Sequence, residues 1–331
     1  MLEIQLEAQG ARPNFRYDIM QPLMQGRAPI DGAVLRPAGV DDVAGFFNNA
    51  NNARFKSGDF GLLDINIGDV LPAIDAGWDL RCLPIFIKRK PVYNYLWVRA
   101  DRGIEQPKDL EGKTFGTVGY SSSISIYTRG FLQHLHGVDL TSLRWLVNGP
   151  GPFPIHNPAI RIDQASGPPK SSAQRLLDGE IDASTGDITD LAMWRALESR
   201  SDVKHFFADY QAQNMQLVKE RGIYTPVHIM VIGGKLDREQ PAIARKVYDA
   251  FERSRQIAYE DALSDATGYS IRTSMRELLR DEVHEFGEIY THGLSKNATV
   301  VDLFLDYCHE QGVTSKRLSR EQVFAAGTLE T

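Results

Sequence analysis

The chain has 331 residues, 42% hydrophobic and 24% charged, which is the composition of a soluble globular protein too long for one small core. Its formal net charge of −6, without any long Lys/Arg run, excludes a general nucleic-acid-binding role. The two cysteines, Cys82 and Cys308, are far apart and outside any CxxC pattern, so we expect free thiols.

Targeting and metal-binding patterns are also missing from the sequence. The first ten residues, MLEIQLEAQG, contain no basic segment followed by an apolar one, and no stretch approaches ~18 consecutive apolar residues. The eight histidines include no HExxH-like spacing. We therefore expect a cytoplasmic protein that does not associate with membranes. The spacing indicates no metal site, and whether the protein depends on a metal stays open.

The first third of the chain alternates predicted strands and helices. Leu2 to Ala8 alternates apolar and polar residues, and Val34 to Arg36 is a second apolar strand. Phe60 to Ile67 is strongly apolar but carries Asp64 and Asn66, which are two apart and so share one face of a strand. A carboxylate in such a run is costly to bury alone, so Asp64 needs a partner or a function.

Two more strands are expected at Leu83 to Lys90 and Tyr93 to Ala100. Their link, Lys88 to Pro91, concentrates positive charge in an acidic protein. It is either a solvated basic turn or part of an anion-binding site.

The stretch from Gly112 to His134 has the strongest local pattern. A short strand, Lys113 to Val118, is broken by Gly119 and followed by hydroxyl-bearing residues from Tyr120 to Ser125. Apolar residues then recur at helical spacing, so a helix starts within the serine run. Unpaired N–H groups and serine hydroxyls at a helix start suit a carboxylate or phosphate. The alternative is an ordinary serine-capped helix.

The next segment predicts a strand at Leu143 to Val147 and then a long irregular region. Residues 148–170 are rich in Gly and Pro and lack periodicity, which is typical of a functional loop or lid. A helix at Ser172 to Leu177 and a strand to Ser184 follow, and Asp187 stands just beyond that strand.

The last third begins with an apolar strand and ends in helices. Tyr224 to Ile232, YTPVHIMVI, has His228 at its centre, either as a core histidine or as a functional one. From Gln240 to Phe324 the apolar spacing is almost entirely helical.

This alternation predicts an α/β protein with two lobes, each a doubly wound sheet. We assign residues 1–98 and 224–331 to the first lobe, with the C-terminal helices packed on it, and residues 99–223 to the second. Two chain crossings between lobes are the architecture of type 2 periplasmic-binding proteins. Their ligand lies between the lobes, near strand ends and helix starts.

Six stretches spread over almost the whole chain match the pattern of a known family. They are Arg16-Tyr17-Asp18 with GR at 26–27, LPIF followed by Arg89, DLEGKTFG with Tyr120 and Arg129-Gly130, LLDGEID, PVHIMVI, and HGLSKNATVVDLFLDYCHEQG. The most specific are PVHIMVI with His228 and the C-terminal segment with Gly293 and Asn297. On these stretches the sequence resembles the 4,5-dihydroxyphthalate decarboxylases.

The chain also departs from the family pattern. Asp64 and Asn66 stand where the family tends to have Glu and Ser, and Pro91-Val92-Tyr93 replaces a Phe-Arg-His segment. A related hydroxybenzoate with one carboxylate therefore stays open beside the phthalate as substrate.

The resemblance implies cofactor-independent decarboxylation of a hydroxylated aromatic carboxylic acid bound between the lobes. Such chemistry needs an acid and a base, together with cations or helix N–H groups that orient the carboxylate. His228 is the candidate acid/base, and Asp64 or Asp187 would orient it or deprotonate the ring hydroxyl. The candidate substrate-binding residues are Arg16, Arg89, Tyr120, Ser121, Ser122, Ser123 and Asn66.

Two other functions fit the same pattern. A solute-binding protein for an anionic aromatic ligand would have the same fold and anion site, although it would need export from the cytoplasm. An enzyme of another type, such as a lyase or isomerase of a small metabolite, is the third reading. The expected partner in each case is a small molecule rather than nucleic acid or membrane, and homo-oligomerisation is left open.

Overall fold

The chain forms two compact units. The computed structural model describes residues 1–8, 17–38, 49–149, 151–168, 170–185, 191–264 and 273–331. The first unit comprises Met1–Arg89, Pro226–Val301 and Leu318–Thr331, and the second comprises Lys90–Thr225 and Asp302–Arg317. The chain therefore passes between the units four times, whereas the sequence analysis expects two crossings.

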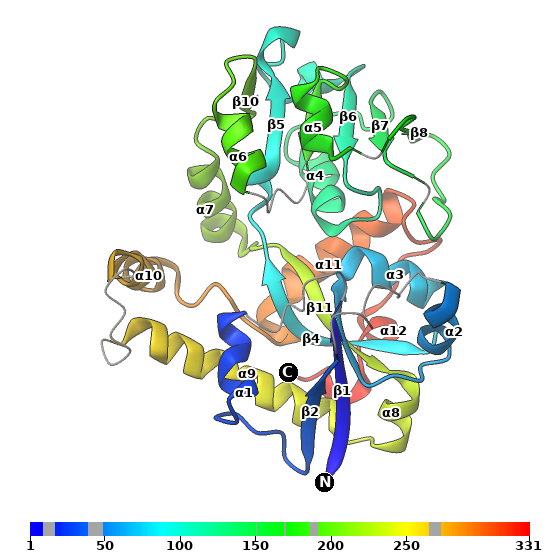
Figure 1. Ribbon diagram of the computed structural model, residues 1–331, viewed down its shortest axis with the longest axis vertical. Coiled ribbons are helices and arrows are strands. Elements are labelled where there is room, and N and C mark those ends of the chain that lie inside the picture. Colours follow the sequence, from blue (N-terminus) through cyan, green and yellow to red (C-terminus); the bar gives the residue numbers. More distant parts are fainter. Residues whose placement is uncertain (9–16, 39–48, 150, 169, 186–190, 265–272) are drawn as a thin grey trace. The chain divides into compact units, whose positions relative to one another are not determined.

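The first unit is built on a five-stranded sheet with the order β2-β1-β3-β11-β4 (Figure 1). β11 is antiparallel to both neighbours, whereas β1 is parallel to β2 and to β3. Because β11 lies between two strands and is covered on both faces, its sequence is almost continuously apolar. The strands are β1 (Leu2–Ala8), β2 (Ala33–Pro37), β3 (Leu62–Asn66), β4 (Leu80–Arg89) and β11 (Pro226–Gly233).

Helix α9 (Ile243–Leu263) covers part of this sheet and packs against β4, α1 and η1. Its buried face, including Val247 and Phe251, joins one core cluster with Ile4 and Leu62 of the sheet. The other helical elements that begin in this unit are η1 (Asp18–Met20), α1 (Gln21–Met24), α2 (Asn49–Lys56), α3 (Ile67–Asp75), α8 (Gly234–Glu239), α10 (Thr273–Phe286), α11 (Leu294–Glu310), α12 (Arg320–Val323) and η7 (Ala326–Thr328).

The second unit has a six-stranded sheet with the order β10-β5-β9-β6-β7-β8. Strands β9, β6, β7 and β8 are parallel, and β5 is antiparallel to β9 and β10. The strands are β5 (Leu96–Arg99), β6 (Thr114–Thr117), β7 (Arg144–Val147), β8 (Arg161–Gln164), β9 (Ala183–Thr185) and β10 (Val203–His205). The helices are η3 (Val92–Tyr95), η4 (Ala100–Arg102), η5 (Pro107–Leu110), α4 (Ser123–His134), α5 (Ser172–Leu177), α6 (Leu191–Glu198) and α7 (Tyr210–Arg221).

The unit boundaries differ from the predicted lobes at two places. Strand β5, assigned above to the first lobe, pairs with β9 and β10, and its Trp97 is buried in the second unit's core with Leu176 and Ile181. Residues 302–317 also belong to the second unit, where Tyr307 packs directly against Gly130 of α4. The C-terminal helices therefore do not pack on the first unit alone.

The predicted structureless region at 148–170 contains an edge strand. β8 runs parallel to β7, with Arg144 opposite Arg161 and Val147 opposite Gln164. Before β8, the backbone N–H of His156 donates to the carbonyl of Gly312 at 2.7 Å. The region is thus tied to its own unit, and the lid interpretation is wrong for this part of it. Only four residues form the strand, three of them polar, so no alternation could reveal it.

Within the described ranges, no helix combines the length and apolarity needed to cross a bilayer.

We expect His205, at the end of β10, to make the second unit sensitive to acid. Its ring centroid lies 3.6 Å from that of Trp97 and 4.3 Å from that of Tyr210, and both ring nitrogens are buried without a hydrogen-bond partner. Burial lowers the pKa of His205 to about 4. Because an unfolded histidine titrates near ~6.5, the unfolded state binds the extra proton first, and stability falls as the pH drops from about 6.5 towards 4.

We expect His205→Phe to remove roughly 1–2 kcal/mol of this acid destabilisation, a figure reduced for the partial exposure of the ring. Urea unfolding at pH 7 and pH 4.5, for both proteins, measures the difference. The same loss of stability in the variant would assign the acid sensitivity to other groups.

Candidate active site

Two strands of the first unit bring His228 and Asp64 together. In the antiparallel pair β3–β11, His228 is opposite Asn66, and Met230 is opposite Asp64. Because side chains alternate along a strand, His228, Asp64 and Asn66 share one face of the sheet. Nδ1 of His228 lies 2.9 Å from Oδ1 of Asp64.

The environment of this pair suits proton transfer. The side chain of Asp64 is 1% exposed and that of His228 is 13% exposed. A carboxylate at Nδ1 keeps the proton on that nitrogen, so Nε2 is the nitrogen left to exchange a proton with a ligand. Within the described part of the chain, Oδ2 of Asp64 is buried without a hydrogen-bond partner, so this carboxylate is not fully satisfied by the fold.

Tyr17 is a third polar group near this pair. Burial raises the pKa of the Tyr17 phenol above its usual range, and the carboxylate of Asp64 and the phenol of Tyr290 raise it further. Tyr17 therefore stays protonated and is a hydrogen-bond donor within electrostatic reach of Asp64. No local pattern predicts this role for Tyr17, which the sequence analysis names only as part of the Arg16-Tyr17-Asp18 match.

Asn66 has a structural task in addition to its predicted one. It is the N-cap of α3, and its Oδ1 accepts a hydrogen bond from the backbone N–H of Gly68 at 3.0 Å. A cap of this kind fixes where β3 ends and α3 begins. The predicted substrate contact would have to use the remaining amide group.

Arg89 is buried rather than part of a solvated basic turn. Its guanidinium is 7% exposed and donates from Nη2 to Oδ1 of Asn297 at 2.5 Å and to the carbonyl of Thr291 at 2.7 Å. It also lies over the rings of Phe86 and Tyr290, at 5.1 and 5.7 Å. The C-terminal segment matched to the family thus holds the predicted carboxylate-binding arginine.

Tyr290 and His292 supply hydrogen-bond partners to the part of β4 that is not paired with β11. The register between β11 and β4 shifts around His228, so part of β4 is not paired with β11. The Tyr290 hydroxyl accepts from the N–H of Arg89 at 2.8 Å and donates to the carbonyl of Ile87 at 3.0 Å. Nδ1 of His292 accepts from the N–H of Phe86 at 3.2 Å. This irregularity beside His228 is therefore stabilised by hydrogen bonds from residues more than 200 positions away.

Truncating Arg89 is expected to destabilise the first unit. Arg89→Ala removes the hydrogen bonds to Asn297 and Thr291 and should lower the free energy of unfolding by roughly 1.5–3 kcal/mol, the range for bonds to a charged group. Denaturant unfolding of both proteins measures this loss. An unchanged midpoint would mean that Arg89 carries little of the packing of this segment and that its role is confined to ligand binding.

The serine turn lies in the second unit, at the start of α4. The helix begins at Ser123, as the sequence predicts, and Ser122 is its N-cap residue. The Ser122 side chain makes no capping hydrogen bond. Ser123 is fully buried, whereas Ser121 and Ser122 are half-buried. Ser121 and Ser122 are therefore the members of the turn placed to meet a ligand.

Tyr120 points into the second unit instead of towards solvent. Its side chain is 6% exposed, and its hydroxyl donates to the carbonyl of Gln311 at 3.0 Å. The guanidinium of Arg129 lies 3.7 Å from its ring centroid. We therefore interpret Tyr120 as a residue that fixes the turn rather than one that contacts substrate.

Four buried hydroxyl-bearing residues lie together near this turn, and no sequence pattern predicts that they do. The Thr117 and Ser125 hydroxyls form a hydrogen bond, and the Thr128 hydroxyl lies 3.2 Å from that of Thr185. All four side chains are buried. They come from β6, α4 and β9, and only the pairing of these elements brings them together.

Two predicted site residues, Arg16 and Asp187, lie outside the described residues. The remaining candidates fall into two sets, one in each unit. A ligand position between the lobes stays a prediction. Among the described residues, no group of three or more His, Cys, Asp or Glu side chains is placed to hold a metal ion. A reaction without any cofactor likewise stays a prediction.

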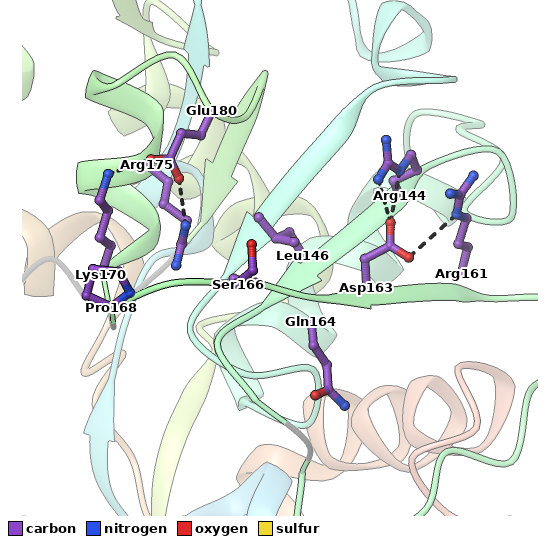
Figure 2. A pocket seen from close by; sticks show the side chains of 11 residues that line it. Arg144, Leu146, Arg161, Asp163, Gln164, Ser166, Pro168, Lys170, Arg175 and Glu180 are labelled. Carbon is purple, nitrogen blue, oxygen red and sulfur yellow. Dashed lines mark hydrogen bonds and ion pairs between the residues drawn. The ribbon is translucent and has the colours of Figure 1, made fainter.

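The second unit also has an open surface pocket of 610 Å³ on β7, β8 and α5. Its basic side chains are all paired: Asp163 pairs with Arg144 and Arg161, and Glu180 pairs with Lys170 and Arg175 (Figure 2). The pocket contains none of the predicted site residues. Each of its cations has a carboxylate partner, and we assign the pocket no role in the site.

Comparison with known proteins supports the resemblance inferred from the sequence. No protein-family model matches the chain. It is 28% identical to a 4,5-dihydroxyphthalate decarboxylase of Comamonas testosteroni, over 95% of this chain and 96% of that protein. The sequence resemblance to the 4,5-dihydroxyphthalate decarboxylases is confirmed. A protein of the same name from Pseudomonas putida is 27% identical over 40% of this chain and 50% of its own length.

Solved structures confirm the predicted fold class, a two-lobed periplasmic-binding-protein-like fold. The sulfonate-binding protein SsuA of Methylobacillus flagellatus matches with a TM-score of 0.57 at 12% identity, over 98% of this chain and 91% of that one. SsuA of Escherichia coli matches with a TM-score of 0.54 at 13% identity, over 98% and 92%. The desulfurization enzyme DSZB matches with a TM-score of 0.51 at 13% identity, over 98% and 97%. These likenesses concern the fold alone.

Proposed function

We propose that the chain is a carboxy-lyase that removes CO2 from a hydroxylated aromatic carboxylic acid, such as 4,5-dihydroxyphthalate or a related hydroxybenzoate. The observation that carries this proposal is the His228–Asp64 pair, with 2.9 Å between Nδ1 and Oδ1. The relatives named as decarboxylases support the reaction class. The proposed enzyme works in the cytoplasm and needs no cofactor.

The pair supplies the proton that this reaction consumes. A ring hydroxyl of the substrate raises the electron density at the carbon that bears the carboxylate. In our proposal, the His228 imidazolium donates its Nε2 proton to that carbon, and the bond to the carboxylate then breaks. The electron pair of that bond restores the aromatic ring, and CO2 leaves. The neutral imidazole regains a proton from water, so each turnover consumes one proton.

Asp64 would favour this step by orienting the ring. Its buried carboxylate lies 2.9 Å from Nδ1 and leaves Nε2 as the nitrogen that exchanges a proton with the substrate. Tyr17, as a protonated phenol near Asp64, would donate a hydrogen bond within the same site. The helix start at Ser121 and Ser122 would hold a carboxylate oxygen of the substrate.

A solute-binding protein for an anionic aromatic ligand is the second candidate. Its support is the likeness of the fold to the two sulfonate-binding proteins. The fold does not decide between the two functions, because the desulfurization enzyme shares it as well. Chemistry at the bound ligand is therefore the property to test.

Turnover in D2O separates the two functions. The purified protein is incubated with 4,5-dihydroxyphthalate, and separately with hydroxybenzoates, while released CO2 is measured. We expect one CO2 per substrate and one deuterium in the product, at the carbon that carried the carboxylate. The rate should survive treatment with EDTA. Stoichiometric binding without CO2 release, for every acid tested, would favour the solute-binding protein and contradict the enzyme.

A further inference from the structure

Arg129 in α4 is a buried cation with an unusual set of partners. Its side chain is 0% exposed. Nε donates to Oε1 of Gln311 at 2.7 Å, and Nη2 donates to the carbonyl of Tyr120 at 2.6 Å. Nη1 is buried and has no hydrogen-bond partner. The guanidinium lies over the rings of Tyr120 and Trp145, at 3.7 and 5.4 Å.

All these partners are neutral, whereas Arg99 and Arg175, two other buried arginines of the same unit, have carboxylate partners. Arg99 lies 2.6 Å from a carboxylate oxygen of Asp101, and Arg175 lies 2.6 Å from one of Glu180. Burying a cation without an opposite charge is expensive, and such charges are normally paired. Burial lowers the pKa of Arg129, but a guanidinium keeps its proton at neutral pH. The second unit therefore carries an uncompensated internal positive charge.

This charge lies directly behind the serine turn. The carbonyl that accepts from Arg129 belongs to Tyr120, which immediately precedes Ser121. Helix α4, which starts at Ser123 and is 12 residues long, adds the partial positive charge of its N-terminus to the same place. Both charges are positive and lie next to the same turn, so their electrostatic potentials add there.

We propose that Arg129 is the electrostatic anchor of an anion site at Ser121 and Ser122, where its buried charge attracts a substrate carboxylate that it does not touch. The proposal rests on the proposed function, since it assigns the carboxylate of the aromatic acid to this turn. Arg129 is thus a positioning residue. The negative charge missing from its surroundings is supplied by the ligand.

Three variants test this assignment with phthalate and inorganic sulfate as probes, using calorimetric Kd values from pH 6 to pH 9. Arg129→Met keeps most of the side-chain volume without the charge. Arg129→Lys keeps the charge on a group that burial can deprotonate. Arg99→Met is the matched control, because Arg99 is a buried arginine of the same unit that has carboxylate partners.

We expect Arg129→Met to weaken phthalate binding about tenfold or more, the equivalent of losing one interaction with a charged group. Arg99→Met should change Kd less than about twofold, although it lowers the melting temperature. Arg129→Lys should bind well at pH 6 and progressively worse towards pH 9, whereas the wild-type affinity stays level over this range. That pH dependence is a readout that a purely structural role would not produce.

If Arg129→Met fails to fold, the pH titration of Arg129→Lys decides the question. A pH-independent affinity equal to the wild type in Arg129→Lys, or an unchanged Kd in a folded Arg129→Met, would overturn the proposal. If the wild-type protein binds sulfate but not phthalate, the proposed function is contradicted. The sulfate Kd values of the Arg129 variants then still test the role of Arg129. If the wild-type protein binds neither anion, there is no anion site at Ser121 and Ser122, and the proposal is wrong.

Discussion

His228→Asn is expected to give a folded protein that binds its aromatic acid but turns it over about 10²–10⁴ times more slowly, the usual contribution of general acid–base catalysis. Asparagine preserves much of the shape of the ring and can still hydrogen-bond to Asp64. It cannot deliver a proton to carbon at neutral pH. The measurement is kcat for 4,5-dihydroxyphthalate, together with calorimetric affinity, on one preparation of each protein.

His205→Asn is the matched control for this substitution. His205 is also a strand histidine, but it stacks on Trp97 and has no carboxylate partner. Its replacement should lower the melting temperature and leave kcat within a few-fold of the wild type. If His228→Asn behaves in the same way as this control, His228 is a core residue and the proposed mechanism is wrong.

The sequence predicts the members of the first-unit pair but not their contact. Period-two alternation places Asp64 and Asn66 on one face of a strand, and the apolar run around His228 predicts another strand. Nothing in either pattern says that β3 and β11, 164 residues apart at this contact, are neighbours. Strand pairing over such a distance depends on the whole topology, which local periodicity does not encode.

Interactions that depend on tertiary structure do not follow from local pattern for the same reason. The sequence leaves residues 88–91 open between a solvated turn and an anion-binding site. The structure shows that Arg89 is buried and donates to the carbonyl of Thr291, 202 positions later. Tyr120 belongs to a hydroxyl-rich turn but is turned inward by Gln311. The helix start at Ser123, by contrast, follows from local capping and spacing, and it was predicted correctly.

Asp64→Asn should lower activity without lowering stability, whereas most core substitutions lower stability. The amide has nearly the shape of the carboxylate but no negative charge, and it can donate as well as accept, so it no longer fixes which nitrogen of His228 carries the proton. We expect kcat to fall by about 10²–10⁴. Because Oδ2 of Asp64 is buried without a partner, removing the charge should leave the free energy of unfolding unchanged or raise it by about 1 kcal/mol.

Glu7→Gln provides the matched control, since Glu7 is a 2% exposed carboxylate of the same sheet. It makes two 2.7 Å hydrogen bonds to Arg54, so its replacement should cost stability without a comparable loss of kcat. Urea unfolding and steady-state kinetics of the two variants test this contrast. The proposed role of Asp64 is to hold a charge beside His228, at a cost in folding stability because that charge is buried. An Asp64→Asn protein that keeps its kcat and loses stability, as Glu7→Gln should, would show that Asp64 only supports the fold.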